Sequence, residues 1–512
     1  MLTGSFSTFF LPISWTLLSL VCFLLYWVVW IIYARCFHPL AKYPGPFLAS
    51  ISRSWMMIQI LRAKSEITQR ELHAKLGPIV RIAPNEVAIA DPEAIKAIYA
   101  VNSGFTKTDF YPPFRPTFAR YPDSFTCLDE RVHASRRKLV NNLYSMSNIV
   151  RAEEGIDSCT EMFMSRMKEF ATTGEIIDVS KWAQMYAFDV VGQLFFSRMF
   201  GFMKNKSDYR GYIRSLDLLL PILTTSCVLP SYIRPIFLLG VVMMPGVYKA
   251  LGSLKDIEAA AESCVSERQR LVESSDASEK KDILSSLFDI VRDKGEKVDF
   301  GMTEVQVEVY VALFAGSDTT AAAISSILYH LMKNPAAYCK LNAEIDAATK
   351  SGLLSTPNVR FNEAMKLPYL VACCKEGMRM HPSVGLTLPR NVPQGGCEIA
   401  GEWFTEGTRV GVNAAVVHRD KSIFGPDADF FNPDRWLREE AVNMDRYMFQ
   451  FGGGSRTCIG KNISLCEIHK LIPQLLRSFD IELTEREWTT HNFWFHKPSN
   501  VNVRLTLKKV DD

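Results

Sequence analysis

The residues of this chain best suited to chemistry lie in a glycine-rich loop near the C-terminus, from Phe451 to Gly460. The loop holds one cysteine, Cys458, with Arg456 two positions before it and four glycines around it. Glycine lets a backbone turn tightly and approach a ligand closely, and the positive end of a predicted helix over Lys461–Phe479 favours a thiolate. A thiolate binds metal ions, but single cysteines are also common as small apolar core residues. The loop alone leaves both interpretations open.

A second unusual segment lies inside a long apolar stretch that predicts a helix from Glu304 to about Met332. The start of this helix resembles a capping box, Thr303-x-x-Gln306. Glycine inside a helix costs about 1 kcal/mol relative to alanine, and Asp and Thr side chains compete for backbone hydrogen bonds. The segment indicates a functional site, a helix kink or an exposed polar face. It reads Ala315-Gly316-Ser317-Asp318-Thr319-Thr320.

Together these two segments resemble the defining motifs of the cytochrome P450 family. The C-terminal loop matches the haem-binding pattern Phe-x-x-Gly-x-Arg-x-Cys-x-Gly at every defining position, and the helical segment matches Ala/Gly-Gly-x-Asp/Glu-Thr. The resemblance implies haem b, with Phe451 in the haem-binding loop and Cys458 as the thiolate ligand of the iron. It also implies that the small residues Ala315 and Gly316 leave room over the haem for dioxygen and substrate.

The same resemblance assigns catalytic roles to Thr319 and Asp318. Cleavage of the O–O bond of dioxygen consumes protons, and a positioned hydroxyl and a nearby acid can supply them. The thiolate of Cys458 would push electron density from the opposite face. The two motifs, about 140 residues apart, therefore predict the two halves of one oxygen-activating site.

A Glu-x-x-Arg sequence, Glu376 to Arg379, places a carboxylate and a guanidinium one helical turn apart. By itself this pattern is common on surface helices. The following Met380-His381-Pro382 makes it similar to the buried Glu–Arg pair of the family, which a later arginine completes. We expect that arginine to be Arg435 and the three residues to brace the loop beneath the haem.

Four basic residues are expected near the carboxylates of the haem. His133 and Arg137 lie four residues apart and share one helical face, an arrangement that also fits a solvated surface. The family resemblance brings this face, Arg390 and Arg456 to the haem propionates. Haem carries two carboxylates, so several cations around it are electrostatically reasonable.

Three segments are expected to form the substrate pocket with Ala315 and Gly316. The first is an aromatic, proline-containing loop over residues 105–125, including Phe110 and Phe114, which could alternatively pack on the surface. The second contains Val384 and Leu386. The third is a predicted turn containing Trp494, for which a plain core hairpin is an equally good interpretation. A further apolar stretch, residues 215–247, is interrupted by prolines and predicts a buried helical hairpin, a membrane-dipping roof over the pocket, or both.

The N-terminal region predicts a membrane anchor. Residues 1–34 carry no charged side chain, and the apolar run from Ile13 to Tyr33 is long enough to cross a bilayer as a helix. A cleaved signal peptide is the alternative, but a basic start and a small-residue cleavage site are not evident. The first charges, Arg35 and Lys42, follow the run, so the positive-inside rule predicts a short lumenal N-terminus and a cytoplasmic catalytic domain. We expect a single-pass protein of the endoplasmic reticulum membrane.

The remaining sequence predicts one mainly helical domain with a small β region. A proline-rich linker over residues 35–46 leads to a catalytic domain over 47–512, in which residues 79–82 and 86–90 predict a β-hairpin and Asp91-Pro92 starts a helix. The chain has a net charge of +3, too small to indicate nucleic acid binding, and its 12 scattered cysteines fit a reducing compartment. The expected fold is that of a cytochrome P450 behind one transmembrane helix.

The resemblance implies a monooxygenase that inserts one oxygen atom from O2 into an apolar small molecule. Electrons would come from NADPH through a separate flavoprotein, NADPH–cytochrome P450 reductase, with cytochrome b5 as a further candidate partner. The segment from Leu76 to Pro92 and the C-terminal part of the chain most resemble filamentous-fungal members of the family. This resemblance favours hydroxylation or epoxidation of a polyketide, terpenoid or alkaloid in secondary metabolism. Two alternatives stay open: a haem-thiolate isomerase or dehydratase that does not use O2, and a non-catalytic haem-binding sensor.

Overall fold

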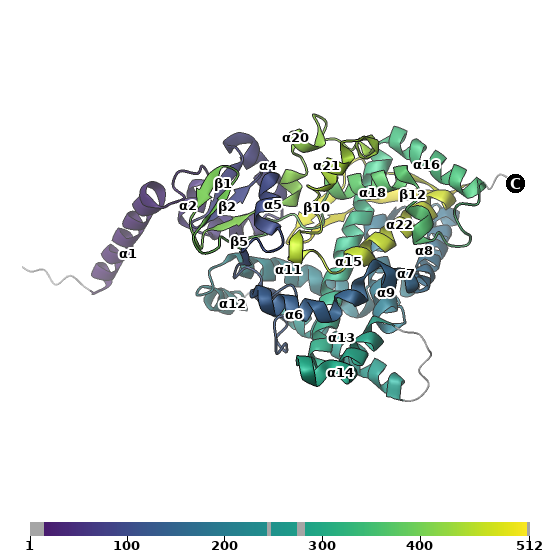
Figure 1. Cartoon of the computed structure of the whole chain (residues 1–512), viewed down its shortest axis with the longest axis horizontal. Coiled ribbons are helices and arrows are strands. Elements are labelled where there is room, and N and C mark those ends of the chain that lie inside the picture. The colour runs from purple at the N-terminus through teal and green to yellow at the C-terminus, as the bar shows by residue number, and fades with distance from the viewer. Residues whose placement is uncertain (1–14, 243–246, 274–281, 509–512) are drawn as a thin grey trace, which may run out of the picture.

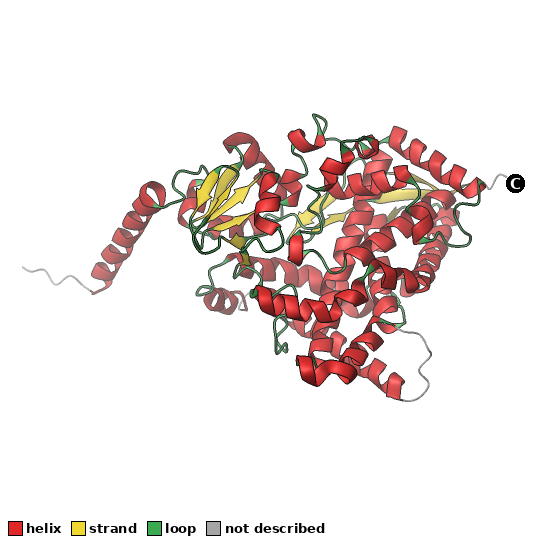
Figure 2. Ribbon diagram, viewed as in Figure 1, coloured by secondary structure: helices red, strands yellow, loops and turns green. Residues whose placement is uncertain are grey.

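The computed structural model describes residues 15–242, 247–273 and 282–508. Helices form most of this part of the chain, and four small sheets lie among them (Figure 2). The expected mainly helical fold with a small β region is therefore confirmed. In chain order the α-helices are α1 Trp15–Ile32, α2 Phe47–Ile51, α3 Ser54–Leu61, α4 Ser65–Leu76, α5 Glu93–Tyr99, α6 Glu130–Val140, α7 Met146–Arg151, α8 Glu153–Thr173, α9 Val179–Phe196, α10 Phe202–Asn205, α11 Tyr212–Val228, α12 Arg234–Val242, α13 Val247–Glu273, α14 Ile283–Val298, α15 Met302–Lys333, α16 Pro335–Lys350, α17 Phe361–Ala364, α18 Pro368–Met380, α19 Ala414–Val417, α20 Lys421–Phe424, α21 Ala441–Asp445 and α22 Lys461–Ser478.

The strands are short and come from distant parts of the chain. The predicted hairpin forms as β1 and β2, which pair antiparallel, and β2 continues the sheet through a parallel pair with β8. In the same sheet β3 pairs with β5, which sets Lys107 opposite Arg390. The strands are β1 Ile79–Ala83, β2 Glu86–Ile89, β3 Thr106–Lys107, β4 Ile177–Asp178, β5 Arg390–Asn391, β6 Cys397–Ile399, β7 Glu402–Phe404, β8 Arg409–Gly411, β9 Phe479–Leu483, β10 Thr489–Asn492, β11 His496–Ser499 and β12 Asn502–Leu507.

Helix α15 runs through the centre of the molecule and packs most extensively against α9 (Figure 1). A Cβ atom at Gly316 would lie 2.7 Å from Val191 Cγ2 of α9, so glycine permits this close contact. The predicted capping box is wrong. The helix starts earlier, because Gly301 is the cap and its N–H donates to the Glu304 carboxylate at 2.7 Å.

Helix α1 stands away from the body of the protein (Figure 1), and none of its side chains is buried. It continues as one π-helical turn, so that a helical stretch from Trp15 to Phe37 is long and apolar enough to cross a membrane. The expected span began at Ile13, which lies outside the described residues. The second helix of sufficient length and hydropathy is α15, but 72% of its most apolar window is buried inside the protein, so it is a core helix.

The proline-rich linker is packed against the sheet rather than free. Arg81 on β1 donates from its backbone N–H to the Pro44 carbonyl at 2.8 Å and from its guanidinium to the Ala34 carbonyl at 2.7 Å. A Cβ atom at Gly45 would lie 2.2 Å from the Arg81 carbonyl oxygen, so only glycine fits there. These contacts fix the angle at which α1 leaves the domain.

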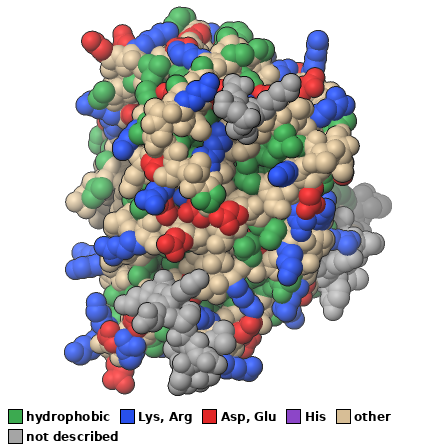
Figure 3. Space-filling view, turned by 90° about the vertical axis from the view of Figure 1, so that its right-hand side faces the viewer, with side chains coloured by type: hydrophobic (Ala, Val, Ile, Leu, Met, Phe, Trp, Pro, Cys, Tyr) green, Lys and Arg blue, Asp and Glu red, His purple; other side chains and the backbone are tan. Residues whose placement is uncertain are grey.

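The opposite end of the molecule has a different surface. Figure 3 shows that face, where Asp and Glu side chains gather near the centre, Lys and Arg side chains are spread around them, and the hydrophobic side chains are scattered. Large exposed hydrophobic side chains follow one another along α1, and others lie around α12, including Tyr232, Ile236 and Leu239. Further exposed hydrophobic side chains, such as Phe430 and Val442, are spread over the rest of the described surface.

Candidate active site

An internal cavity with a water-accessible volume of about 280 Å³ separates α15 from the Cys458 loop. Its walls come from segments spread over most of the chain, and they are mainly apolar and aromatic. It brings together most of the predicted site residues. Those that line it are Phe114, Arg137, Ala315, Gly316, Thr319, Val384, Leu386, Phe451, Arg456, Cys458 and Trp494.

The cysteine loop is closed by a hydrogen bond from the Cys458 N–H to the Phe451 carbonyl at 2.8 Å. Gly454 has a φ of 58°, and a Cβ atom there would lie 2.0 Å from the Tyr99 carbonyl oxygen, so the loop can sit this tightly on α5 only with glycine. The Cys458 side chain is surrounded by protein atoms but keeps solvent-accessible surface, and it lines the cavity. The loop thus presents a sulfur atom to the cavity.

The Cys458 thiol experiences opposing influences. Burial raises its pKa, while hydrogen bonds from the backbone N–H groups of Gly460 and Lys461 and the charge of Arg137 lower it. These two N–H groups belong to the start of α22, where unpaired donors point out of the helix. Each such contact favours the thiolate.

The opposite wall of the cavity carries Thr319. Its hydroxyl donates to the Ala315 carbonyl one turn earlier at 2.9 Å, and its own carbonyl accepts from Ser383 Oγ at 2.7 Å. The Thr319 side chain therefore bonds to the backbone of α15 and also lines the cavity. Thr319 and Cys458 lie on facing walls, the arrangement that a catalytic hydroxyl and a metal ligand on opposite sides of one cofactor require.

Asp318 does not line the cavity; it faces the other side of α15. Its carboxylate is fully buried, accepts from Gln184 Nε2 of α9, and lies 3.8 Å from Lys497 Nζ. Lys497 Nζ in turn lies 2.6 Å from Asp217, whose side chain is 49% exposed. Burial raises the pKa of Asp318, and the charge of Lys497 opposes that rise. A chain of ionisable groups therefore connects solvent to the middle of α15.

The sequence did not predict Gln184, Lys497 or Asp217 as functional residues. They come from α9, β11 and α11, and no local pattern marks them. Phe110 was predicted in the pocket but lies behind its wall, where its ring packs against Phe114 and Trp494 with centroids 6.2 and 5.3 Å away. It lines a neighbouring smaller pocket instead.

Basic side chains gather at one end of the cavity. Arg137 donates to the Thr457 carbonyl at 3.0 Å, and Arg456 forms an ion pair with Glu130 at 2.7 Å. Lys107, which the sequence did not single out, also lines the cavity. Its only sequence signal is its positive charge near the start of the aromatic-rich loop over residues 105–125. Arg390 is buried behind it and donates to Tyr111 Oη and to the Pro389 carbonyl.

Among the described residues this basic cluster has more cationic side chains than nearby carboxylates, which include Glu130 and Asp123. Both ring nitrogens of buried His133 have no hydrogen-bond partner among the described residues. Burial, followed by Arg456, Lys107 and Arg137, lowers the pKa of His133 to about 3. Burial and then the charges of Arg390 and Arg456 hold the pKa of Lys107 well below its usual value. A buried group with two carboxylates, such as haem, fits a cluster of this kind.

The predicted brace forms as expected. Glu376 on α18 is fully buried and pairs with Arg379 at 2.8 Å and with Arg435 at 3.0 Å. Trp436 Nε1 and the Asn432 N–H also donate to this carboxylate, at 2.9 and 2.8 Å. Arg379 reaches further to the carbonyls of His418, Ala428 and Phe430. One carboxylate therefore joins α18 to the segment that precedes the cysteine loop.

The family model that describes cytochrome P450 matches residues 44–501 of this chain. The chain belongs to the cytochrome P450 family. Cytochrome P450 monooxygenase gsfF from Penicillium aethiopicum is 41% identical over 488 residues, which cover 94% of this chain and 96% of that protein. Pisatin demethylase from Fusarium vanettenii is 36% identical over 488 residues, covering 92% of this P450 and 90% of the demethylase.

Cytochrome P450 monooxygenase cicH from Emericella nidulans is 36% identical over 490 residues, covering 94% of this chain and 96% of cicH. Family membership implies haem iron with thiolate ligation, and Cys458 is the cysteine of the matching loop. Two of these three fungal relatives are named cytochrome P450 monooxygenases, so the comparisons support an oxygenase, an oxidoreductase. They do not support the isomerase, dehydratase or sensor that the sequence left open.

Proposed function

We propose that this P450 inserts one oxygen atom from O2 into an apolar small molecule, by hydroxylation or epoxidation, in a secondary-metabolic pathway of a filamentous fungus. One observation carries the proposal: a mainly apolar cavity lies between the Cys458 sulfur and the Thr319 hydroxyl. Cys458 would hold the haem iron, the guanidinium groups of Arg137, Arg390 and Arg456 would balance the haem carboxylates, and His133 and Lys107 would donate hydrogen bonds to them. When bound, haem supplies the activation of dioxygen.

The protein's part in the reaction is to deliver protons and to position the substrate. Asp217 takes up protons at the surface, and Lys497 relays them to Asp318. Lys497 Nζ lies 2.6 Å from Asp217 and 3.8 Å from Asp318. Thr319 presents a hydroxyl to the cavity one residue further along α15. A positioned acid and hydroxyl typically accelerate proton transfer by about 10²–10⁴-fold. The Asp318–Thr319 pair thus connects a solvent-fed side of α15 with its reaction side.

The substrate is proposed to be an apolar, ring-containing compound. Phe114, Phe314, Trp494 and Phe495 form part of the cavity wall, and neighbouring rings among them meet in edge-on or tilted pairs with centroids 5.5–6.0 Å apart. Aromatic side chains bind flat apolar molecules because they bury a large apolar area and because the quadrupoles of aromatic rings attract one another. One relative is named a demethylase of pisatin, and this P450 is proposed to act on a natural product of comparable chemical class.

Electrons are proposed to come from NADPH through a separate reductase, with cytochrome b5 as a second donor. Helix α1 would anchor the protein in the endoplasmic reticulum membrane, with residues 1–14 lumenal and the domain in the cytoplasm. Arg35 and Lys42 follow the helix and fit this orientation. The exposed side chains of Ile236 and Leu239 would add a second contact with lipid.

The proposed reaction is tested by isotope labelling. The full chain is co-expressed with an NADPH–cytochrome P450 reductase in yeast that is fed a library of fungal natural products under ¹⁸O2. We expect a product that carries one ¹⁸O atom and that disappears when the reductase is omitted. A product that gains oxygen only from labelled water, or that forms without reductase, would contradict the proposal.

A further inference from the structure

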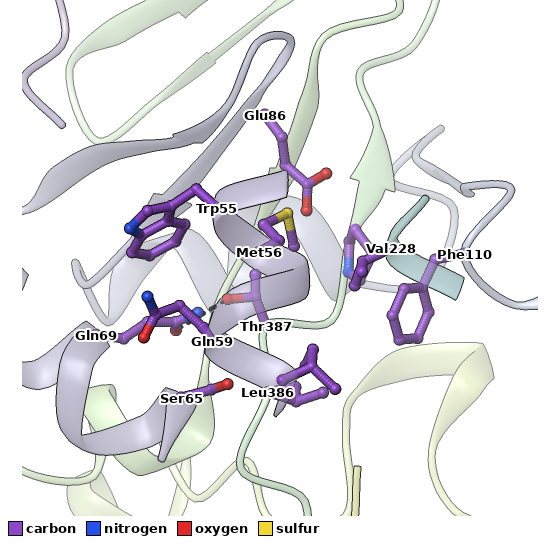
Figure 4. Close-up of a pocket in the computed structure, with 12 residues that line it drawn as sticks. Trp55, Met56, Gln59, Ser65, Gln69, Glu86, Phe110, Val228, Leu386 and Thr387 are labelled. Atoms are coloured by element: carbon purple, nitrogen blue, oxygen red, sulfur yellow. Dashed lines mark hydrogen bonds between the residues drawn. The ribbon is translucent and has the colours of Figure 1, made fainter. Parts of the chain in front are cut away.

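A second, smaller pocket lies beside the active-site cavity, between α3, α4, β2 and the segment 386–389 (Figure 4). Apolar side chains make most of its wall, among them Trp55, Met56, Phe110 and Leu386. Its water-accessible volume is about 20 Å³, which admits one group of the size of a hydroxyl or a water molecule. The pocket can therefore hold one end of a ligand.

Two buried polar groups point into this pocket without a partner. Glu86 is 0% exposed, and its Oε1 atom receives no hydrogen bond from any residue that the structure describes. Ser65 is 2% exposed, and its Oγ atom likewise lacks a partner in the described chain. An unpaired buried polar group typically costs about 1–3 kcal/mol. In Figure 4 the Glu86 carboxylate descends toward the pocket from one side and Ser65 lies on another.

The charge of Glu86 is already balanced. Arg53 approaches its Oε2 atom at 2.6 Å and also donates to the Val228 carbonyl at the end of α11. The remaining oxygen, Glu86 Oε1, is therefore best matched by a neutral hydrogen-bond donor. An ammonium group would bring a second, uncompensated positive charge into a buried site, which is unfavourable.

The pocket is separated from the active-site cavity by only one layer of side chains. Leu386 lines both spaces. Phe110 lines the small pocket and packs against Phe114 and Trp494, which line the cavity. A rotation of these side chains would join the two spaces, so a molecule in the cavity could extend one end toward Glu86.

We propose that the Glu86–Ser65 pocket is a polar subsite that binds the hydroxyl group of an otherwise apolar substrate. The hydroxyl donates to Glu86 Oε1, Ser65 Oγ adds a second polar atom to the lining of the same pocket, and the apolar body extends past Leu386 and Phe110 into the cavity. The proposal rests on the proposed function only in taking the bound molecule to be a substrate. It adds a chemical requirement, one alcohol or phenol group at the end remote from the site of attack.

The test compares two probes of nearly equal shape, 4-bromophenol and 4-bromotoluene, on the full-length holoenzyme in lipid nanodiscs. Equilibrium dialysis against empty nanodiscs gives the dissociation constant of each probe, and their ratio gives the hydroxyl preference. Wild type is expected to prefer the phenol at least about tenfold, as a hydrogen bond to a charged group provides. Matched reduced carbon-monoxide spectra report haem incorporation, so a failed monooxygenase assignment is distinguishable from a failed subsite.

Two variants locate the preference. The double variant Arg53→Met/Glu86→Leu removes the acceptor without leaving a lone buried charge and is expected to abolish the preference. Ser65→Ala loses no hydrogen bond seen among the described residues, should fold as wild type, and is expected to lower the preference severalfold. Ser158→Ala, the same substitution on α8, should leave it unchanged. Absence of a preference in wild type, or an equal preference in all four proteins, would show that the pocket holds only a structural water.

Discussion

Some residues that bear on the reaction are marked by a local sequence motif, whereas others matter only through contacts with distant parts of the chain. Cys458 and Thr319 are marked by their own motifs, and the structure brings both to one cavity. Lys107, Lys497 and Glu86 carry no motif, because their importance arises from contacts with distant segments, such as the one between Lys497 and Asp217, 280 residues apart. Local sequence predicts a reactive group, but only the fold shows what surrounds it.

Lys497 is expected to set the pH dependence of turnover. Burial raises the pKa of Asp318, and Lys497 is the main influence that opposes this rise. Asp318 donates protons only in its protonated form, so turnover should fall as pH rises through this raised pKa. Lys497→Met removes the opposing charge, so the fall should move to higher pH, and the maximal rate should drop about tenfold as part of the acid's contribution is lost.

The pH–rate profile of NADPH-supported product formation measures both effects. Lys508→Met is the matched control, because Lys508 contacts Asp346 at 3.5 Å, remote from the cavity-lining residues. A Lys497→Met profile that coincides with wild type, or that moves to lower pH, would rule out this role for Lys497.

At the scale of elements, α15 and α18 position the two sides of the site. The sequence predicted α15 from its long apolar stretch and placed Glu376 and Arg379 one helical turn apart. The first turn of α15 was predicted two residues late, because the cap is a glycine whose partner is Glu304. The Glu376 network was predicted as three residues, and the structure adds Trp436 and the Asn432 N–H. Sequence spacing identifies pairs of residues on one helix. It cannot identify hydrogen-bond donors from a loop that packs against the helix, because their positions depend on how that loop folds.

Replacement of Glu376 is expected to prevent stable haem binding. Glu376→Ala leaves Arg379 and Arg435 as buried charges without their carboxylate, a change that typically costs about 3–5 kcal/mol. The loop that follows this network carries Cys458, so its disorder should release haem. The measurement is the haem-to-protein ratio after purification, with Glu440→Ala as an exposed control. Normal haem content and normal thermal stability in Glu376→Ala would contradict the bracing role.

At the scale of the whole molecule, the longest run of exposed hydrophobic side chains lies on α1. Helix α1 and the exposed side chains around α12 occupy one end (Figure 1), and the far end carries mixed charges (Figure 3). The sequence predicted the anchor from its unbroken apolar run. It left the role of residues 215–247 open between a buried hairpin and a membrane-dipping roof. In the described part, α11 is largely buried, while α12 exposes Ile236 and Leu239 at 71% and 72%.

Helix α12 is therefore expected to bind lipid independently of α1. A variant lacking residues 2–34 should still co-sediment with phospholipid vesicles, because each aliphatic side chain that enters lipid contributes about 1.5–3 kcal/mol. Adding Ile236→Ser and Leu239→Ser should abolish this residual binding. Carbon-monoxide spectra of each variant verify that the domain remains folded. Equal sedimentation with and without the two serine substitutions would exclude α12 as the second contact.

The central claim is that Cys458 provides a thiolate ligand to haem in this cavity. The spectrum of the reduced carbon-monoxide complex tests it most directly, since a thiolate ligand shifts the Soret band to long wavelength. The wild-type holoenzyme should give the shifted band, and Cys458→Ser should lose it while Cys466→Ser, a change at a buried cysteine of α22, should retain it. A wild-type spectrum without the shifted band, or a Cys458→Ser spectrum that keeps it, would contradict the account.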